Sequence, residues 1–158
     1  MSIRGRIFFI ILSCLFIGLS LAFIVAERDL SEGLQQQIES ELSKQAKILR
    51  QSFAESPKVN NYNSLKSQID SYSDASGSRI TLIARDGLVL VDSDIAMDIL
   101  ESLDNHSNRP EVIAAFNNGS GSSKRFSNSI QQDMLYFALL DTTSNPERVI
   151  RISVTNEY

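Results

Sequence analysis

Residues 79–91 read RITLIARDGLVLV and carry the clearest structural signal in the chain. Two runs rich in β-branched residues, Arg79–Ala84 and Leu88–Val91, are joined at Asp86-Gly87. An Asp-Gly pair between two such runs is typical of a β-hairpin, because both residues accept the backbone angles that tight hairpin turns require. The sequence therefore predicts two antiparallel strands here.

Three further extended runs follow the hairpin, at Lys124–Ser129, Met134–Leu140 and Val149–Thr155. Together with the hairpin they predict five strands. The preceding segment 119–125, GSGSSKR, lacks the G-x-x-x-x-G-K-[ST] spacing of a phosphate-binding loop and leads into a strand, where such a loop leads into a helix. We interpret it as a glycine-rich turn that enters the third strand.

Short helical segments lie between the hairpin and the later strands. Asp92-Ser93-Asp94 closes the hairpin and is expected to cap a short helix over Ile95–Leu100. After a polar loop, Pro110 opens a second helix over Glu111–Phe116, and Gly119 ends it.

The N-terminal region contains an uncharged apolar stretch, Ile7–Ala26. A helix of this length matches the ~30 Å hydrocarbon core of a membrane. Arg4 and Arg6 precede the stretch and acidic residues follow it, so we expect a single-pass anchor with a cytoplasmic N-terminus. A cleaved signal peptide is the alternative, but its apolar part is usually only ~7 to 15 residues long. Ile24 also occupies a position where cleavage after Ala26 requires a small residue.

An amphipathic pattern continues beyond the apolar stretch and predicts a long helix that ends at Ser56-Pro57-Lys58. Its apolar residues recur at steps of three and four, as one helix face requires: Leu30, Leu34, Ile38, Leu42, Ala46, Leu49 and Phe53. This stripe either packs on its own domain or also pairs with a second copy, and we favour the homodimer. A shorter helix is predicted over Asn63–Tyr72, with the polar run 73–78 ending it.

The order of these elements is helix, helix, two strands, short helices and three strands. This order is typical of an α+β domain with a five-stranded antiparallel sheet and helices mainly on one face. Loops and small helices on the opposite face of such a sheet can hold a small ligand. We therefore expect a binding region there.

The composition excludes several classes of function. With 158 residues and a formal net charge of −4, the chain suits one compact domain and lacks the clustered basic residues that bind nucleic acid. Cys14 is the single cysteine and His106 the single histidine, so we expect no internal disulfide, no metal site and no cofactor. No serine lies in a nucleophile-elbow pattern, and we name no catalytic residue.

Four polar residues lie where a ligand can reach them: His106 and Arg109 in the polar loop, Arg125 on the third strand and Tyr136 on the fourth. Arginine offers a planar fork for carboxylate or phosphate, and histidine titrates near neutral pH. We predict a ligand-binding or switching role for them. Each also has a structural alternative: Arg109 pairs with Glu111, Arg125 lies on a solvated strand face, or Tyr136 belongs to the core.

Several short motifs occur in an order that resembles one known family. They are SRITLI at 78–83, DGLVLVDS at 86–93, NH at 105–106, RPEV at 109–112, Ala115, Gly119, Gly121, RFS at 125–127, LYFA at 135–138 and VIRIS at 149–153. Over nearly all of residues 1–155 the chain resembles the membrane anchor and extracytoplasmic sensor domain of bacterial two-component sensor histidine kinases of the phosphate-regulon type.

The resemblance implies a PAS/Cache-like input domain on a dimeric receptor of the bacterial inner (plasma) membrane, which signals through shifts of paired helices. On this basis we divide the chain into a cytoplasmic N-terminus (1–6), a transmembrane helix (7–26), a long signalling helix (27–56) and an extracytoplasmic sensor domain (57–158). Residues 1–158 are expected to lack the kinase core of the parent histidine kinase.

The predicted function is therefore the signal-sensing input region of such a kinase, which recognises a small molecule or a periplasmic partner. The alternative is a stand-alone, kinase-less interaction protein that is anchored in the membrane and forms mixed dimers with a full-length receptor.

Overall fold

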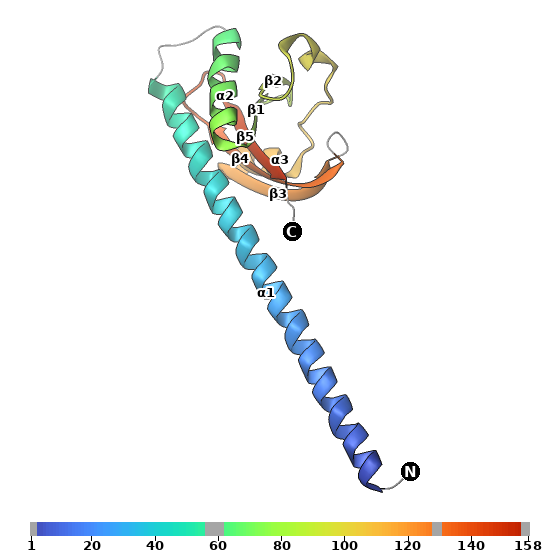
Figure 1. The fold of residues 1–158 in the computed structure, drawn as a ribbon. Helices are drawn as coiled ribbons and strands as arrows, with labels where there is room; N and C mark the ends of the chain where they lie inside the picture. Colours follow the sequence, from blue (N-terminus) through green and yellow to red (C-terminus); the bar gives the residue numbers. More distant parts are fainter. Residues whose placement is uncertain (1–2, 56–61, 128–130, 156–158) are drawn as a thin grey trace. The chain divides into compact units, whose positions relative to one another are not determined.

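A computed structural model of the chain describes residues 3–55, 62–127 and 131–155. These residues form two compact units, one up to Ile38 and one from Glu39 onward. The elements in chain order are α1 (Ile3–Glu55), α2 (Tyr62–Ser76), β1 (Arg79–Ala84), β2 (Val89–Asp92), the 3₁₀ helix η1 (Met97–Ser102), α3 (Pro110–Asn118), β3 (Ser120–Ser127), β4 (Gln132–Asp141) and β5 (Arg148–Thr155) (Figure 1).

The first unit is the N-terminal part of α1, and its side chains are largely apolar and exposed. Phe16 and Phe23, for example, are 72% and 69% exposed. The helix is long and apolar enough to cross a membrane. The predicted continuity between the apolar stretch and the long helix is confirmed, because α1 runs unbroken through Gly33. Residues 56–58, which the sequence predicts to end it, lie outside the described residues.

The second unit is built on a five-stranded antiparallel sheet with the strand order β2-β1-β5-β4-β3. The predicted α+β class is thereby confirmed. The hairpin at its edge forms as expected: Gly87 has a φ of 86°, a left-handed conformation that glycine adopts without strain. The backbone N–H of Ala84 donates to the carbonyl of Leu88 at 2.9 Å and closes the turn.

One face of this sheet packs against α2 and residues 39–55 of α1. The buried side chains of this layer are Leu42, Ala46 and Leu49 of α1, Leu65 and Ile69 of α2, and Ile80, Leu82, Ile150 and Ile152 of the central strands. Ser78 Oγ donates to Gln45 Oε1 at 3.1 Å and links β1 to α1. The middle of the predicted apolar stripe therefore packs on its own domain, while Leu30 is 65% exposed.

The opposite face carries α3. A small apolar cluster joins Val112 and Ala115 of α3 to Ile83, Ala138 and Val149 of the sheet. Gly121 of β3 permits this packing, because a Cβ there would contact Ala114 Cβ and lie 2.7 Å from the carbonyl oxygen of Glu111. The short helix is therefore held tightly on β3, with its first turn over the middle of the sheet.

Some element boundaries differ from those the sequence predicts. α2 continues to Ser76 and ends at Gly77, whose φ is 65°. The glycine-rich segment interpreted as a turn is instead the start of β3, since Ser120–Ser123 pair with Leu139–Tyr136 of β4. Pairing with a long neighbouring strand outweighs the weak strand propensity of serine and glycine there. The predicted end of this strand, Asn128-Ser129, lies outside the described residues.

The predicted cap after the hairpin is also wrong. The helical segment begins later, at Met97, is a 3₁₀ helix, and has Ala96 at its N-cap without a side-chain hydrogen bond. Asp92 is instead buried, and its carboxylate binds Arg79 and Thr81. A carboxylate enclosed by donors is better stabilised there than at an exposed helix end.

Candidate functional site

The sheet face that carries α3 becomes polar beyond the apolar cluster. Strand register places side chains from all five strands on this face, next to the first turn of α3. We call the following set the polar face: Arg79, Thr81, Asp92, Glu111, Ser123, Arg125, Tyr136, Arg151 and Ser153. Most of these side chains are buried.

Glu111 is the central carboxylate of the polar face and is fully buried. Ser123 Oγ donates to its Oε2 at 2.6 Å. Its Oε1 accepts a long hydrogen bond from Arg125 Nη2 at 3.4 Å and lies 3.7 Å from Arg151 Nη1. One carboxylate oxygen is thus shared, at long distances, between two guanidinium groups.

Arg151 comes from the central strand β5 and is only 4% exposed. Its Nη2 donates to Thr81 Oγ1 at 3.0 Å. Burial lowers the pKa of its guanidinium to about 10, against the opposing effect of Glu111 and Asp92. The group therefore stays protonated at neutral pH and places a full positive charge inside the domain.

Tyr136 of β4 lies beneath both arginines. The guanidinium carbon of Arg125 is 3.9 Å from the centroid of its ring, and that of Arg151 is 5.2 Å from the same centroid. An aromatic ring attracts cations through its quadrupole, and the contact is stronger where water is excluded. Tyr136 therefore holds two positive groups side by side.

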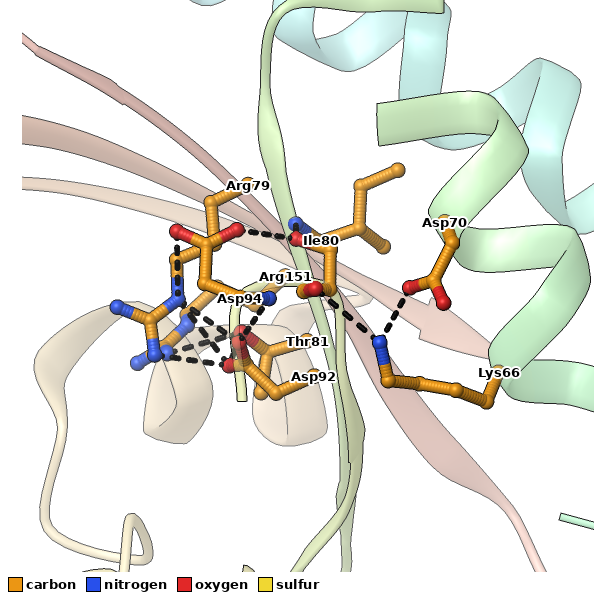
Figure 2. Close-up of polar contacts among 9 residues, drawn as sticks. Lys66, Asp70, Arg79, Ile80, Thr81, Asp92, Asp94 and Arg151 are labelled. Carbon is orange, nitrogen blue, oxygen red and sulfur yellow. Dashed lines mark hydrogen bonds and ion pairs between the residues drawn. The ribbon is translucent and has the colours of Figure 1, made fainter. Parts of the chain in front are cut away.

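A polar relay fixes the position of Arg151 from the edge of the sheet (Figure 2). Arg79 binds Asp92 through two nitrogens, Nε to Oδ1 at 3.0 Å and Nη2 to Oδ2 at 3.1 Å. Thr81 Oγ1 donates to Asp92 Oδ2 at 2.8 Å and accepts from Arg151. Asp92 is thereby saturated by a forked ion pair of the strong, well-aligned kind.

The same end of the hairpin is tied to α2 (Figure 2). Lys66 Nζ forms an ion pair with Asp70 at 2.5 Å and donates to the carbonyl of Ser93 at 3.1 Å. A shift of α2 would therefore also move Ser93, the residue that follows Asp92.

The loop 104–109 is locked onto the hairpin turn. Asn105 Nδ2 donates to the carbonyl of Asp86 at 2.9 Å, and the N–H of His106 donates to the carbonyl of Gly87 at 2.8 Å. A Cβ on Gly87 would collide with Asn105 Oδ1 and with the backbone of Ser107. The turn and the loop thus position His106 together.

His106 lies in positive surroundings. Burial first, and then the charges of Arg151, Arg109 and Arg125, lower its pKa from 6.5 to about 4, against a backbone hydrogen bond that raises it. Its Nδ1 lies 2.6 Å from the carbonyl oxygen of Asp104. Because a carbonyl only accepts, Nδ1 carries the proton and the neutral ring keeps Nε2 as an acceptor at pH 7.

The structure gathers all four residues that the sequence singles out. Arg125 and Tyr136 are in contact on the polar face, and His106 and Arg109 lie beside it, where Arg109, Arg125 and Arg151 affect the pKa of His106. No ion pair joins Arg109 to Glu111 within the described residues, because Glu111 turns to Arg125 and Arg151 instead. Arg125 is only 27% exposed and not on a solvated face, and Tyr136 is buried.

Sequence reasoning missed Arg151, Glu111, Thr81 and Asp92. A signal for Arg151 does exist: it is the one charged residue in the run Val149–Val154, which is apolar apart from Arg151 and Ser153. The partner Glu111 has no comparable signal. In the described part of the chain, no group of three His, Cys, Asp or Glu side chains is arranged to hold a metal ion.

The fold is that of PAS/Cache-like sensory domains, and solved structures with this fold belong to a bacterial chemoreceptor. The ligand-binding domain of the Campylobacter jejuni chemoreceptor Tlp3 in complex with L-valine is similar, with a TM-score of 0.58 and 13% identity. The sensory domain of the same receptor is similar with isoleucine bound (TM-score 0.55, 12% identity) and in a further structure (0.53, 11%).

Each of these matches covers 80% of the present chain. The chain spans 57% of the length of the first two structures and 58% of the third. No protein-family model and no curated protein matches the sequence.

Proposed function

We propose that the chain is the membrane-anchored, extracytoplasmic input region of a bacterial two-component histidine kinase, similar to the phosphate-regulon sensors. In this proposal residues 1–6 are cytoplasmic, 7–26 span the membrane, 27–56 form the signalling helix and 57–158 form the sensor domain. The apolar exposed helix and the PAS/Cache-like fold support it. The solved structures with a similar fold are themselves described as ligand-binding or sensory domains.

The observation that carries the proposal is the polar face. A structural sheet face would bury apolar side chains, yet here Arg151, Glu111 and Tyr136 are buried together on three different elements. Burying charged groups costs free energy that apolar packing would not cost. Ionisable groups with shifted pKa values, here Arg151 and His106, gather at functional sites more often than elsewhere. The polar face, with His106 and Arg109 beside it, is therefore the proposed ligand site.

In this proposal the signal passes from the site to the long helix through β3 and β4, which hydrogen-bond to residues 39–55 of α1. Ser122 of β3 donates to Glu39 of α1 at 2.7 Å, and Arg50 of α1 donates to the carbonyl of Leu140 at 3.4 Å. A ligand that binds two arrangements of these elements with different affinity would shift their populations. In a homodimer paired through the membrane and long helices, such a shift would reach the partner helix.

The sensing role is tested by thermal unfolding of the full chain in detergent against a panel of amino acids, carboxylates and phosphates. We expect at least one compound class to raise Tm, because a ligand that binds only the folded state stabilises it. The effect should be lost in Arg125→Gln and kept in Lys124→Gln, which alters the neighbouring, exposed residue on the opposite face of β3. A wild-type chain that no compound stabilises would contradict the proposal.

The kinase linkage is tested by the nucleotide sequence that follows the codon for Tyr158 in the same frame. A second apolar span and a histidine-kinase core would support the input-region proposal. A stop codon would favour the mixed-dimer alternative, for which co-purification with a full-length receptor is the decisive measurement.

A further inference from the structure

Buried donors without a partner concentrate at the proposed ligand site. Within the described chain, the Nε atoms of Arg109, Arg125 and Arg151 and the Oγ of Ser153 are buried and have no hydrogen-bond partner. An unpaired buried polar group costs about 1–3 kcal/mol, so native domains rarely leave several of them together. The Nε of an arginine only donates. A group that pairs with these Nε atoms must therefore be a hydrogen-bond acceptor.

Glu111 does not provide enough acceptors for these arginine donors. Its Oε1 is 3.4 Å from Arg125 and 3.7 Å from Arg151, whereas the two other buried carboxylates of the described residues, Asp92 and Asp141, have tighter ion pairs. Arg148 lies 2.9 Å from Asp141, and Arg79 lies 3.0 Å from Asp92. Charge-assisted hydrogen bonds are normally about 2.7–2.9 Å long. The two guanidiniums at Glu111 are thus held near a carboxylate without being saturated by it.

The charge of the region is also unbalanced. Arg125 and Arg151 face one carboxylate, Glu111, because Asp92 and the half-exposed Asp94 both pair with Arg79. Arg109 adds a third positive charge near His106. His106 has a pKa lowered to about 4 in these surroundings and adds no charge at pH 7. An additional negative group would relieve the repulsion between the arginines.

We propose that the site binds a small oxyanion of net negative charge, a carboxylate or a phosphate, whose oxygens accept hydrogen bonds from Arg109, Arg125 and Arg151. This inference rests on the proposed sensing function. It assigns a ligand class different from L-valine and isoleucine, which are bound in two of the similar structures. An amino acid is a zwitterion, and its ammonium group needs a carboxylate partner in the site. Both carboxylates of the polar face already have partners: Asp92 binds Arg79 and Thr81. Glu111 binds Ser123 and faces two arginines.

The test is calorimetric titration of the full chain in detergent at pH 7 with three probes: inorganic phosphate, succinate and L-valine. We expect phosphate or succinate to bind at least about tenfold more tightly than L-valine, since each charge-assisted hydrogen bond can account for a factor of this size. The tighter of the two anions identifies which oxyanion the site prefers.

The variants are Arg109→Gln and Arg125→Gln, with Lys124→Gln as the matched control. Arg109 has no ion pair within the described residues, so its replacement breaks none and makes the variant informative. Each arginine variant should weaken anion binding about tenfold or more, and the control should leave it unchanged.

Two results would overturn the assignment. Tighter binding of L-valine than of both anions, lost in Arg109→Gln, would refute the anion class and leave the sensing function standing. Failure of both anions to bind at millimolar concentration, or anion binding that both arginine variants retain, would refute the oxyanion site itself. The Tm panel then decides independently whether the domain binds any small molecule.

Discussion

Replacement of Glu111 by glutamine tests the electrostatic account of the polar face most severely. The substitution keeps the shape of the side chain and removes the charge that faces Arg125 and Arg151. Removing one partner of a buried ion pair typically costs about 3–5 kcal/mol, because the other charge stays buried without compensation. Arg151 is 4% exposed, but Arg125 is 27% exposed and both distances are long. We therefore expect Glu111→Gln to lower the free energy of unfolding by about 3 kcal/mol, the lower end of that range.

This loss should appear as a decrease in Tm on the order of 10 °C for a domain of this size. The variant should also bind phosphate or succinate more tightly than the wild type, since the site has lost its competing carboxylate. A ligand at 100 times its Kd stabilises by about 2.7 kcal/mol, so saturating anion should restore most of the lost stability. The assay is thermal and urea unfolding of the full chain with and without anion.

Asp141→Asn is the matched control. Asp141 is also fully buried and pairs with Arg148 at 2.9 Å, but on the opposite face of the sheet. It should destabilise the domain comparably, and anion should stabilise it no more than it stabilises the wild type, because its binding site is unchanged. Wild-type stability of the Glu111 variant, or equal anion rescue in both variants, would refute the reasoning.

Three further predictions follow from the packing and the protonation of the domain. Gly121→Ala should lower the free energy of unfolding, measured in urea, by about 1–3 kcal/mol, because the added Cβ would clash with α3. An unchanged unfolding midpoint would mean that α3 does not pack on β3 as described. Leu42→Ala should lower the free energy of unfolding by about 2–5 kcal/mol, because Leu42 is buried. Ile48 is exposed, so Ile48→Ala should change this free energy by less than about 0.5 kcal/mol. Equal losses would contradict the packing of α1 on the sheet. The pKa of His106 is about 4 in the folded chain and 6.5 in the unfolded chain, so the unfolded chain binds the proton first as pH falls. The free energy of unfolding should therefore fall between pH 6.5 and pH 4, by about 1–2 kcal/mol because solvent screens this half-buried ring. His106→Gln should remove this part of the pH dependence in urea unfolding at pH 7 and pH 4.5, and an unchanged dependence would contradict a half-buried, neutral histidine.

The parts of the fold that the sequence predicts well are those fixed by local chemistry. The hairpin follows from Asp86-Gly87, and the end of α3 follows from Gly119, whose φ is 88°. The start of β3 could not be predicted in this way. Ser120–Ser123 form a strand because β4 supplies the pairing partner, and that partner lies further along the chain.

In the candidate site too, the sequence predicts the features that local chemistry sets but not those that the assembled fold sets. His106 and Arg109 stand out in the sequence because a polar loop carries them between two structured segments. The pairing of Glu111 with Arg125 and Arg151 depends on the register of β3 and β5 and on the close approach that Gly121 permits. Sequence proximity favours Arg109 as the partner of Glu111, but the side chain of Glu111 faces the sheet. Contacts of this kind are set by the assembled fold.

The most direct measurement of the central claim is the NMR signal of the arginine Nε–H groups in the full chain, recorded as phosphate or succinate is added. The account predicts that the resonances of Arg109, Arg125 and Arg151 shift together and saturate at one ligand concentration, while that of Arg85, exposed and paired with Glu147, stays in place. Resonances at the three buried positions that do not move, or that move no more than that of Arg85, would contradict it.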